Sequence, residues 1–104
     1  MRRASLAALA LAAAACGTGA SAPTAHRVEI RAFRYLPDTV TAAPGNTVVW
    51  TNADVVPHTA RAAGAWDTGE IGAAGEGRIV AGAPGTYRYD CAYHPTMHAV
   101  LVVR

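Results

Sequence analysis

Residues 84–103 read PGTYRYDCAYHPTMHAVLVV, and this stretch decides the fold of the chain. Pro84-Gly85 is a turn signal, and the alternation of side-chain types in residues 86–90 predicts a half-buried strand. Residues 99–103 (AVLVV) form a continuous apolar run, which is typical of a buried strand. Between the two predicted strands lies DCAYHPTMH, residues 90–98. The stretch therefore predicts two strands joined by a loop that holds a cysteine, two histidines and a methionine.

The rest of the chain from residue 26 repeats this pattern of short segments and turns, without a convincing helix. The segments that look extended are 27–33 (RVEIRAF), 39–42 (TVTA), 47–51 (TVVWT), 58–62 and 78–81. About seven or eight short strands, with turns every eight to twelve residues, predict an all-β domain built as a small sandwich of two sheets. Its core is expected to include Trp50, Tyr87, Tyr89 and Leu101.

The first residues are typical of a secretory leader. Met1-Arg2-Arg3 precedes an apolar run at residues 4–15, which is too short to span a bilayer, and Cys16 closes this run. The residues that follow are small and polar, as in a flexible linker. The expected organisation is a leader at 1–16, a linker at 17–25 and one folded domain at 26–104.

The end of the leader is similar to a bacterial lipoprotein signal, in which Cys16 is acylated and anchors the protein to a membrane. Ala13 stands where such signals usually have leucine. Ordinary cleavage after Ala20-Ser21-Ala22, which would give a plain secreted protein, is the alternative. In both cases we expect an exported protein, located in the periplasm or at the cell surface.

The charge of the chain gives no support to nucleic-acid binding. The formal net charge of +2 comes from Arg2 and Arg3, because the other residues hold seven arginines and seven acids. Nucleic-acid-binding domains need a basic face, so no nucleic acid is expected as a partner.

Two cysteines in an exported protein could form a disulfide. Cys16 lies at the leader boundary, however, so Cys91 is left without a plausible partner. Because an unpaired thiol is prone to oxidation, we expect something to occupy it.

Cys91, His94 and Met97 are spaced three residues apart. On a helix the first and third would drift apart around the axis, and Pro95 would remove a backbone donor. On a strand, residues three apart face opposite sides of the sheet. The spacing therefore predicts a curled loop whose three donor side chains converge on one point.

Thiolate, thioether and imidazole are donors that favour copper, whereas a structural zinc site normally has four Cys or His ligands. A blue-copper centre has two imidazoles, one thiolate and a weak axial thioether, so one more histidine is needed. His58 is the candidate, because it follows the strong 47–51 strand by a short loop. His26 is an alternative at the start of the domain, and His98 is expected to point away from Met97.

Motifs spread over the whole domain carry a family resemblance. They are Phe33-x-Tyr35-x-Pro37, Pro44-Gly45-x-Thr47-Val48-x-Trp50-x-Asn52, Pro57-His58, Trp66-Asp67-Thr68-Gly69, Pro84-Gly85-Thr86-Tyr87-x-Tyr89-x-Cys91 and Cys91-x-x-His94-Pro95-x-Met97. The chain resembles the cupredoxins, the type I blue copper proteins of the plastocyanin and azurin family, and its short ligand loop has the amicyanin-like length. The resemblance implies a Greek-key sandwich and one copper ion, Cu(I) or Cu(II), bound by His58, Cys91 and His94, with Met97 as the axial ligand.

The resemblance also implies a monomeric electron carrier without enzymatic activity, which exchanges electrons with redox proteins such as a dehydrogenase, a cytochrome or an oxidase. We expect electrons to pass through the exposed edge of His94, within a small patch formed by Pro57, Tyr93, Pro95 and Thr96. Exported copper storage or delivery through the same four ligands is the alternative function.

Enzymatic use of Cys91 as a nucleophile, with His94 as its base, would leave His58 and Met97 without a role. Two positions depart from the family pattern. Thr59 stands where many relatives have asparagine, and Ala92 stands where a hydroxyl residue is common. The link between the two ligand loops is therefore expected to differ from that of the relatives.

Overall fold

A computed structural model describes residues 24–104, which form strands joined by turns and loops. The predicted leader, Cys16 and residues 17–23 of the predicted linker lie outside the described residues, whereas Ala25, predicted as the last residue of the linker, begins the first strand. No helix among the residues described is long and apolar enough to cross a membrane.

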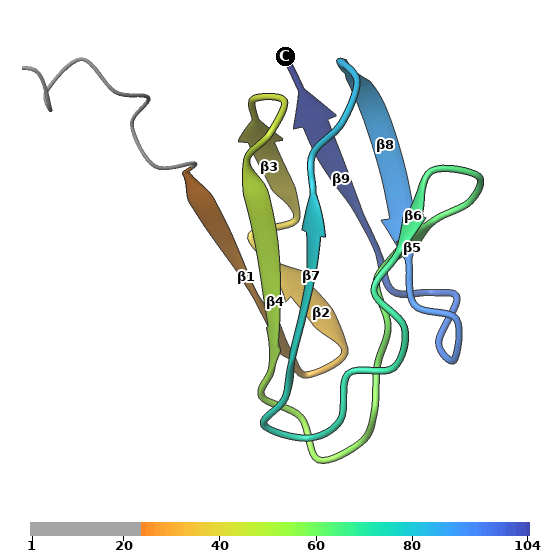
Figure 1. Cartoon of the computed structure of the whole chain (residues 1–104). Coiled ribbons are helices and arrows are strands. Elements are labelled where there is room, and N and C mark those ends of the chain that lie inside the picture. Colours follow the sequence, from red (N-terminus) through yellow and green to blue (C-terminus); the bar gives the residue numbers. More distant parts are fainter. Residues whose placement is uncertain (1–23) are drawn as a thin grey trace, which may run out of the picture.

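The described residues contain nine strands in two sheets (Figure 1). The strands are β1 (Ala25–Arg31), β2 (Arg34–Leu36), β3 (Thr39–Ala42), β4 (Thr47–Asn52), β5 (Arg61–Ala62), β6 (Trp66–Asp67), β7 (Glu76–Val80), β8 (Gly85–Asp90) and β9 (His98–Val103). One sheet has the order β2-β1-β4-β7 and the other has the order β3-β9-β8-β5-β6. The prediction of an all-β sandwich is confirmed, and the number of strands exceeds the predicted seven or eight because β2, β5 and β6 are very short.

Both sheets are mixed. β1 pairs with β4 and β3 pairs with β9 in parallel, and the remaining pairs are antiparallel. The chain passes from one sheet to the other after β2, β3, β4, β6 and β7. These crossings bring loops from distant parts of the sequence together at the ends of the sandwich.

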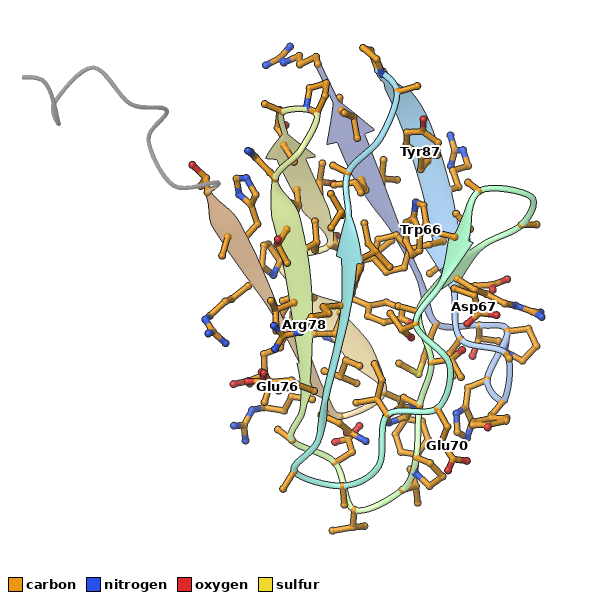
Figure 2. All side chains as sticks on the ribbon, in the orientation of Figure 1. Trp66, Asp67, Glu70, Glu76, Arg78 and Tyr87 are labelled. Carbon is orange, nitrogen blue, oxygen red and sulfur yellow. The ribbon has the colours of Figure 1, made fainter. Side chains whose placement is uncertain are left out.

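The core lies between the sheets, because alternate residues of each strand point inward. In β7, for example, Gly77 and Ile79 are buried whereas Glu76, Arg78 and Val80 are exposed. Figure 2 shows Glu76 and Arg78 on the outer side of this strand. The predicted core residues Trp50, Tyr89 and Leu101 are fully or almost fully buried, and Tyr87 packs against the core while remaining partly exposed.

The β1–β2 connection differs from its prediction as one extended segment, 27–33. β1 ends at Arg31, and the chain reverses through Ala32 and Phe33 so that Arg34 pairs with Arg31. Both turn residues have positive φ, 51° for Ala32 and 60° for Phe33. A two-residue hairpin turn with positive φ at both positions usually contains Asn or Gly, so its sequence signal is missing here.

Three connections gather at one end of the molecule (Figure 1). They are the β1–β2 turn, the segment between β4 and β5, and the loop between β8 and β9. The second contains His58, and the third contains Cys91, His94 and Met97. The topology therefore brings all four predicted ligands to the same end of the sandwich.

Candidate metal centre

The loop between β8 and β9 consists of two successive turns closed by hydrogen bonds. The His94 N–H donates to the Cys91 carbonyl (3.3 Å), and the Met97 N–H donates to the His94 carbonyl (2.8 Å). The Cys91 N–H donates to the Met97 carbonyl (3.2 Å), which ties the two ends of the loop together. Each of these two turns joins residues three positions apart, so the spacing of Cys91, His94 and Met97 matches the turns. The predicted curl is confirmed.

The segment that carries His58 is fixed to the core by Asn52, the last residue of β4. The Asn52 side chain is completely buried, and its Nδ2 donates to the carbonyls of Val56 (2.8 Å) and Ile71 (3.0 Å). Its Oδ1 accepts a hydrogen bond from the Asp54 N–H (2.9 Å). His58 itself exchanges two backbone hydrogen bonds with Ile71. The backbone around His58 is therefore fixed both by the Asn52 side chain and by the pairing with Ile71.

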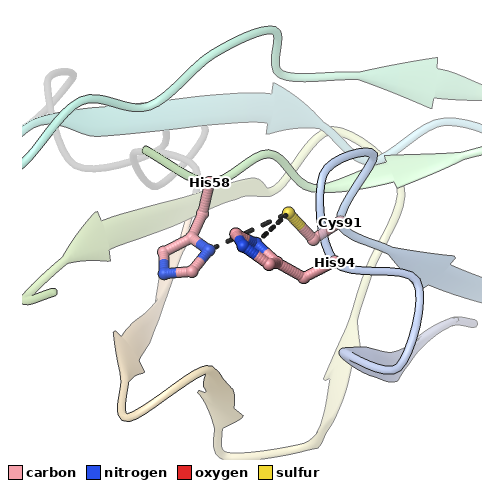
Figure 3. Close-up of side chains that lie close together, drawn as sticks. All are labelled: His58, Cys91 and His94. Carbon is pink, nitrogen blue, oxygen red and sulfur yellow. Dashed lines mark hydrogen bonds between the residues drawn. The ribbon is translucent and has the colours of Figure 1, made fainter. Parts of the chain in front are cut away.

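Three predicted ligands converge at this end of the sandwich (Figure 3). The Cys91 Sγ lies 3.9 Å from Nδ1 of His58 and 3.7 Å from Nδ1 of His94. For a first-row metal, bonds of about 2.0 Å to nitrogen and about 2.3 Å to sulfur, at an angle of about 120°, separate the two donor atoms by about 3.7 Å. The observed spacing therefore fits a metal ion in the plane of the three atoms.

The chemistry of the donor set narrows the choice of metal. Two imidazoles and one thiolate in a trigonal arrangement, with a thioether nearby, are the ligands of a type I copper site. Cys91 is a free cysteine with no exposed surface, so its sulfur is shielded from solvent as well as unpaired. Met97 is buried in the same loop, with 3% of its surface exposed. Copper is therefore the cofactor that these residues fit.

The other two histidines of the chain lie apart from this cluster. His26 is near the start of β1, and its Nε2 lies 3.0 Å from the Asn46 Oδ1 at the opposite end of the sandwich. His98 is the first residue of β9 and is exposed next to the buried Met97, as expected for a side chain that points away from Met97.

Thr59 connects the two ligand loops through two separate hydrogen bonds. Its backbone N–H donates to the Cys91 Sγ (3.4 Å), and its Oγ1 accepts from the Ala92 N–H (2.8 Å). The Thr59 side chain therefore binds the backbone of Ala92, and the side chain of Ala92 is not needed for the link. Thr59 and Ala92 stand where the family pattern has other residues, and the structure gives Thr59 a linking role.

Asp54 is a site residue that the sequence did not single out. Its Oδ2 lies 2.8 Å from Nε2 of His58, on the side of the ring away from Cys91. Burial raises the pKa of Asp54, but hydrogen bonds from the Phe33 N–H, from His58 and from the Ala32 N–H outweigh this effect, and the pKa lies below its usual value. The sequence signal for Asn52 and Asp54 is the polar Asn-Ala-Asp turn after β4, which is typical of any loop.

Phe33 covers the two imidazoles from the β1–β2 turn. Its ring centroid lies 5.1 Å from that of His58 and 4.8 Å from that of His94, in edge-to-face geometry in both cases. Phe33 remains 47% exposed, as does Tyr93 at 49%, and His94 is partly exposed between them. The site is thus shielded from solvent at His58 and accessible to solvent at His94.

Comparisons with known proteins identify the family and the fold. A family model described as a cupredoxin-like domain matches residues 3–103. The fold is similar to that of a Cu(I) amicyanin mutant, with a TM-score of 0.73, 24% identity, and coverage of 81% of this chain and 86% of that one. A purple cupredoxin from Nitrosopumilus maritimus gives a TM-score of 0.70 at 23% identity, covering 76% of this chain and 99% of that one.

A larger protein shares the same fold over part of its length. The copper-containing nitrite reductase of Thermus scotoductus SA-01 matches with a TM-score of 0.73 and 25% identity, over 85% of this chain but only 24% of that chain. No curated protein sequence matches the chain.

Proposed function

The chain belongs to the cupredoxin-like family, and from that premise we propose that it carries single electrons between redox proteins. The observation that carries the proposal is the convergence of the Cys91 sulfur with Nδ1 of His58 and Nδ1 of His94. When copper is bound, it supplies a one-electron couple between Cu(I) and Cu(II). Met97 is proposed as the axial ligand, because it is buried in the same loop as Cys91 and His94.

The residues around the donors suit a site that changes oxidation state with little movement. His58 is completely buried, and its backbone pairs with Ile71. The Cys91 sulfur accepts the Thr59 N–H, which stabilises a thiolate at this position. A site held in this way keeps its donor atoms in place when the charge changes.

We assign electron entry and exit to the edge of His94. Its ring is partly exposed, whereas His58 has no exposed surface. Phe33 and Tyr93 provide exposed aromatic surface beside it. A small apolar patch of this kind suits brief docking with a redox protein, such as a dehydrogenase, a cytochrome or an oxidase.

An enzymatic role for Cys91 is not part of the proposal. The thiol has no exposed surface, so a substrate atom has no access to it in this conformation. The similarity to nitrite reductase covers only 24% of that chain, and its activity is not transferred to this protein.

The proposal is tested by adding Cu(II) to the purified domain and recording the visible spectrum. Wild-type protein is expected to develop an intense thiolate-to-Cu(II) band, and Cys91→Ala is expected to lose it. Met97→Leu is expected to keep the band and to raise the reduction potential, because a weak axial donor is removed. A wild-type protein that binds exchangeable Cu(I) without the band would contradict electron transfer and favour copper storage or delivery.

We further propose that the protein is exported and held at a membrane through an acylated Cys16. The charged start, the apolar run at residues 4–15 and the small residues around Cys16 support this proposal. Mass spectrometry of the mature N-terminus is expected to find lipid on Cys16, and Cys16→Ala should release the protein from the membrane fraction. An unmodified N-terminus after residue 22 would show ordinary cleavage instead.

A further inference from the structure

The Asp54 carboxylate connects the β1–β2 turn with His58, two parts of the molecule that are distant in sequence. Its Oδ1 accepts the Ala32 N–H (2.7 Å), and its Oδ2 accepts the Phe33 N–H (2.9 Å). The same Oδ2 lies 2.8 Å from Nε2 of His58. The side chain of Asp54 is 14% exposed, so most of it is removed from solvent.

These contacts determine which nitrogen of His58 carries the proton. An ionised carboxylate only accepts hydrogen bonds, so the neutral His58 ring must donate through Nε2–H. The lone pair is then on Nδ1, which faces the Cys91 sulfur at 3.9 Å. This tautomer is the one that can bind a metal through Nδ1.

The same carboxylate supports an unfavourable turn. Positive φ costs non-glycine residues about 1–2 kcal/mol each, and Ala32 and Phe33 both adopt it. Asp54 accepts the N–H groups of both residues, which offsets part of this cost. Because the turn carries Phe33, Asp54 also fixes the ring that lies against both imidazoles.

We propose that Asp54 is the positioning residue of the copper site. It fixes the His58 tautomer and ties the β1–β2 turn to the segment between β4 and β5 that carries His58. This inference rests on the proposed function. The negative charge beside His58 stabilises Cu(II) more than Cu(I), because the ion with the higher charge gains more from a nearby anion. Asp54 therefore lowers the reduction potential as well as strengthening Cu(II) binding.

Asp54→Asn tests the proposal with little change in shape. An amide has one acceptor oxygen and one donor NH2 group, so it cannot accept from both sides as the carboxylate does. With the NH2 group toward His58, it would favour protonation of Nδ1, the nitrogen that copper needs. Asp67→Asn is the matched control, because Asp67 is exposed, caps its own turn at the Gly69 N–H and carries the same charge.

The first measurement needs no copper. Nitrogen-15 chemical shifts of the apoprotein are expected to show His58 protonated at Nε2, and a population protonated at Nδ1 should appear in Asp54→Asn. A wild-type ring protonated at Nδ1 would overturn the proposal. Because the metal-free protein is measured, this result is independent of the proposed function.

The second measurement compares binding of Cu(II) and Cu(I). Asp54→Asn is expected to weaken Cu(II) binding by about 10-fold to 100-fold, with a smaller effect on Cu(I). Each tenfold difference between the two affinities raises the potential by about 59 mV. An unchanged potential in folded Asp54→Asn, or the same shift in Asp67→Asn, would overturn the proposal.

Adding Ala32→Gly to Asp54→Asn separates the two roles of Asp54, since glycine accepts positive φ without strain. Stability is expected to recover while the potential stays raised. Recovery of both would mean that Asp54 acts only through the turn, and the positioning role would be rejected. Failure of the proposed function would appear instead in the wild type, as absence of the thiolate-to-Cu(II) band.

Discussion

His58 and His94 present the same ring atom to the same sulfur, but the loops that carry them differ in almost every other respect. His58 is completely buried, its outer nitrogen faces Asp54, and its backbone is paired with Ile71. His94 is partly exposed, and among residues 24–104 no hydrogen bond to its outer nitrogen is found. The His58 imidazole is thus fixed through its outer nitrogen, whereas the His94 imidazole is positioned by its own short loop.

This difference suggests a division of labour within one site. The His58 segment supplies rigidity, because Asn52, Asp54 and His58 each have hydrogen-bond partners outside the segment. The loop from Cys91 to Met97 supplies access, because it places a ligand at the surface. The electron carrier proposed above would need both properties, and the two loops would provide them separately.

The largest expected effect comes from removing each imidazole in turn. His58→Gly and His94→Gly should both lose the intense visible band of the copper-loaded protein. Added imidazole is expected to restore the band in His94→Gly, because that cavity opens to solvent, and not in His58→Gly, whose cavity is enclosed. The visible spectrum with and without imidazole measures both outcomes. Equal rescue of the two variants would contradict the difference between the loops.

The connection between the loops gives the next largest effect. Thr59→Val keeps the shape of the side chain but leaves the Ala92 N–H without its acceptor. A loss of about 2 kcal/mol in the free energy of unfolding of the apoprotein is expected, as for an unpaired polar group in a partly buried site. Urea unfolding measures the change, and Thr59→Ser, which keeps the hydroxyl, should lie close to wild type. Equal stability of Thr59→Val and wild type would show that the loops do not depend on this bond.

A smaller effect is expected in the core beneath both loops. The Trp50 Nε1–H donates to the Tyr89 hydroxyl (3.2 Å), so Tyr89→Phe removes the acceptor and should cost about 1 kcal/mol in urea unfolding. If this core is a shared support, the visible band of the copper-loaded variant should not change. A large spectral change would instead show that Tyr89 contributes to the position of the Cys91 loop.

The same tyrosine predicts a pH dependence. Burial raises the pKa of Tyr89 to about 12, although the hydrogen bond from Trp50 opposes this shift. The unfolded chain, with a tyrosine pKa of about 10, loses its proton first, so stability is complete below about pH 10 and falls as the pH rises toward 12. Unfolding of Tyr89→Phe measured over this range should show a shallower decline than wild type.

The smallest effect is expected at the surface of the open loop. The Tyr93 hydroxyl donates to Glu70 (2.9 Å) between exposed residues, and Figure 2 shows Glu70 near this end of the molecule. Tyr93→Phe is expected to change the free energy of unfolding by less than about 0.5 kcal/mol. Its spectrum and potential should match wild type. A marked loss of stability would show that the open loop is fixed more firmly than its exposure indicates.

The sequence predicted those parts of the molecule that depend on local spacing. The spacing of Cys91, His94 and Met97 excludes helix and strand, and the structure shows the two turns that make them converge. The apolar runs at residues 47–51 and 99–103 likewise predict β4 and β9, since buried strands are rich in valine and aromatic residues.

The parts that could not be predicted depend on contacts between distant residues. Ala32 and Phe33 read as a continuation of β1, because neither residue signals a positive φ, and the groups that support the turn belong to Asp54. Thr59 likewise acquires its role only where its hydroxyl meets the Ala92 N–H of another loop. In both cases the deciding partner lies more than twenty residues away.

The parallel pairing of β3 with β9 has a consequence for the order in which the molecule assembles. β9 is the last strand, and it pairs with β3 near the beginning of the domain as well as with its neighbour β8. Such long-range pairing closes large loops, which makes folding slow compared with folding from local contacts. The Cys91 loop is closed at its far end next to β9, where the Cys91 N–H donates to the Met97 carbonyl. Met97 therefore reaches its position only when β9 has paired, so the complete set of four proposed ligands forms late in folding.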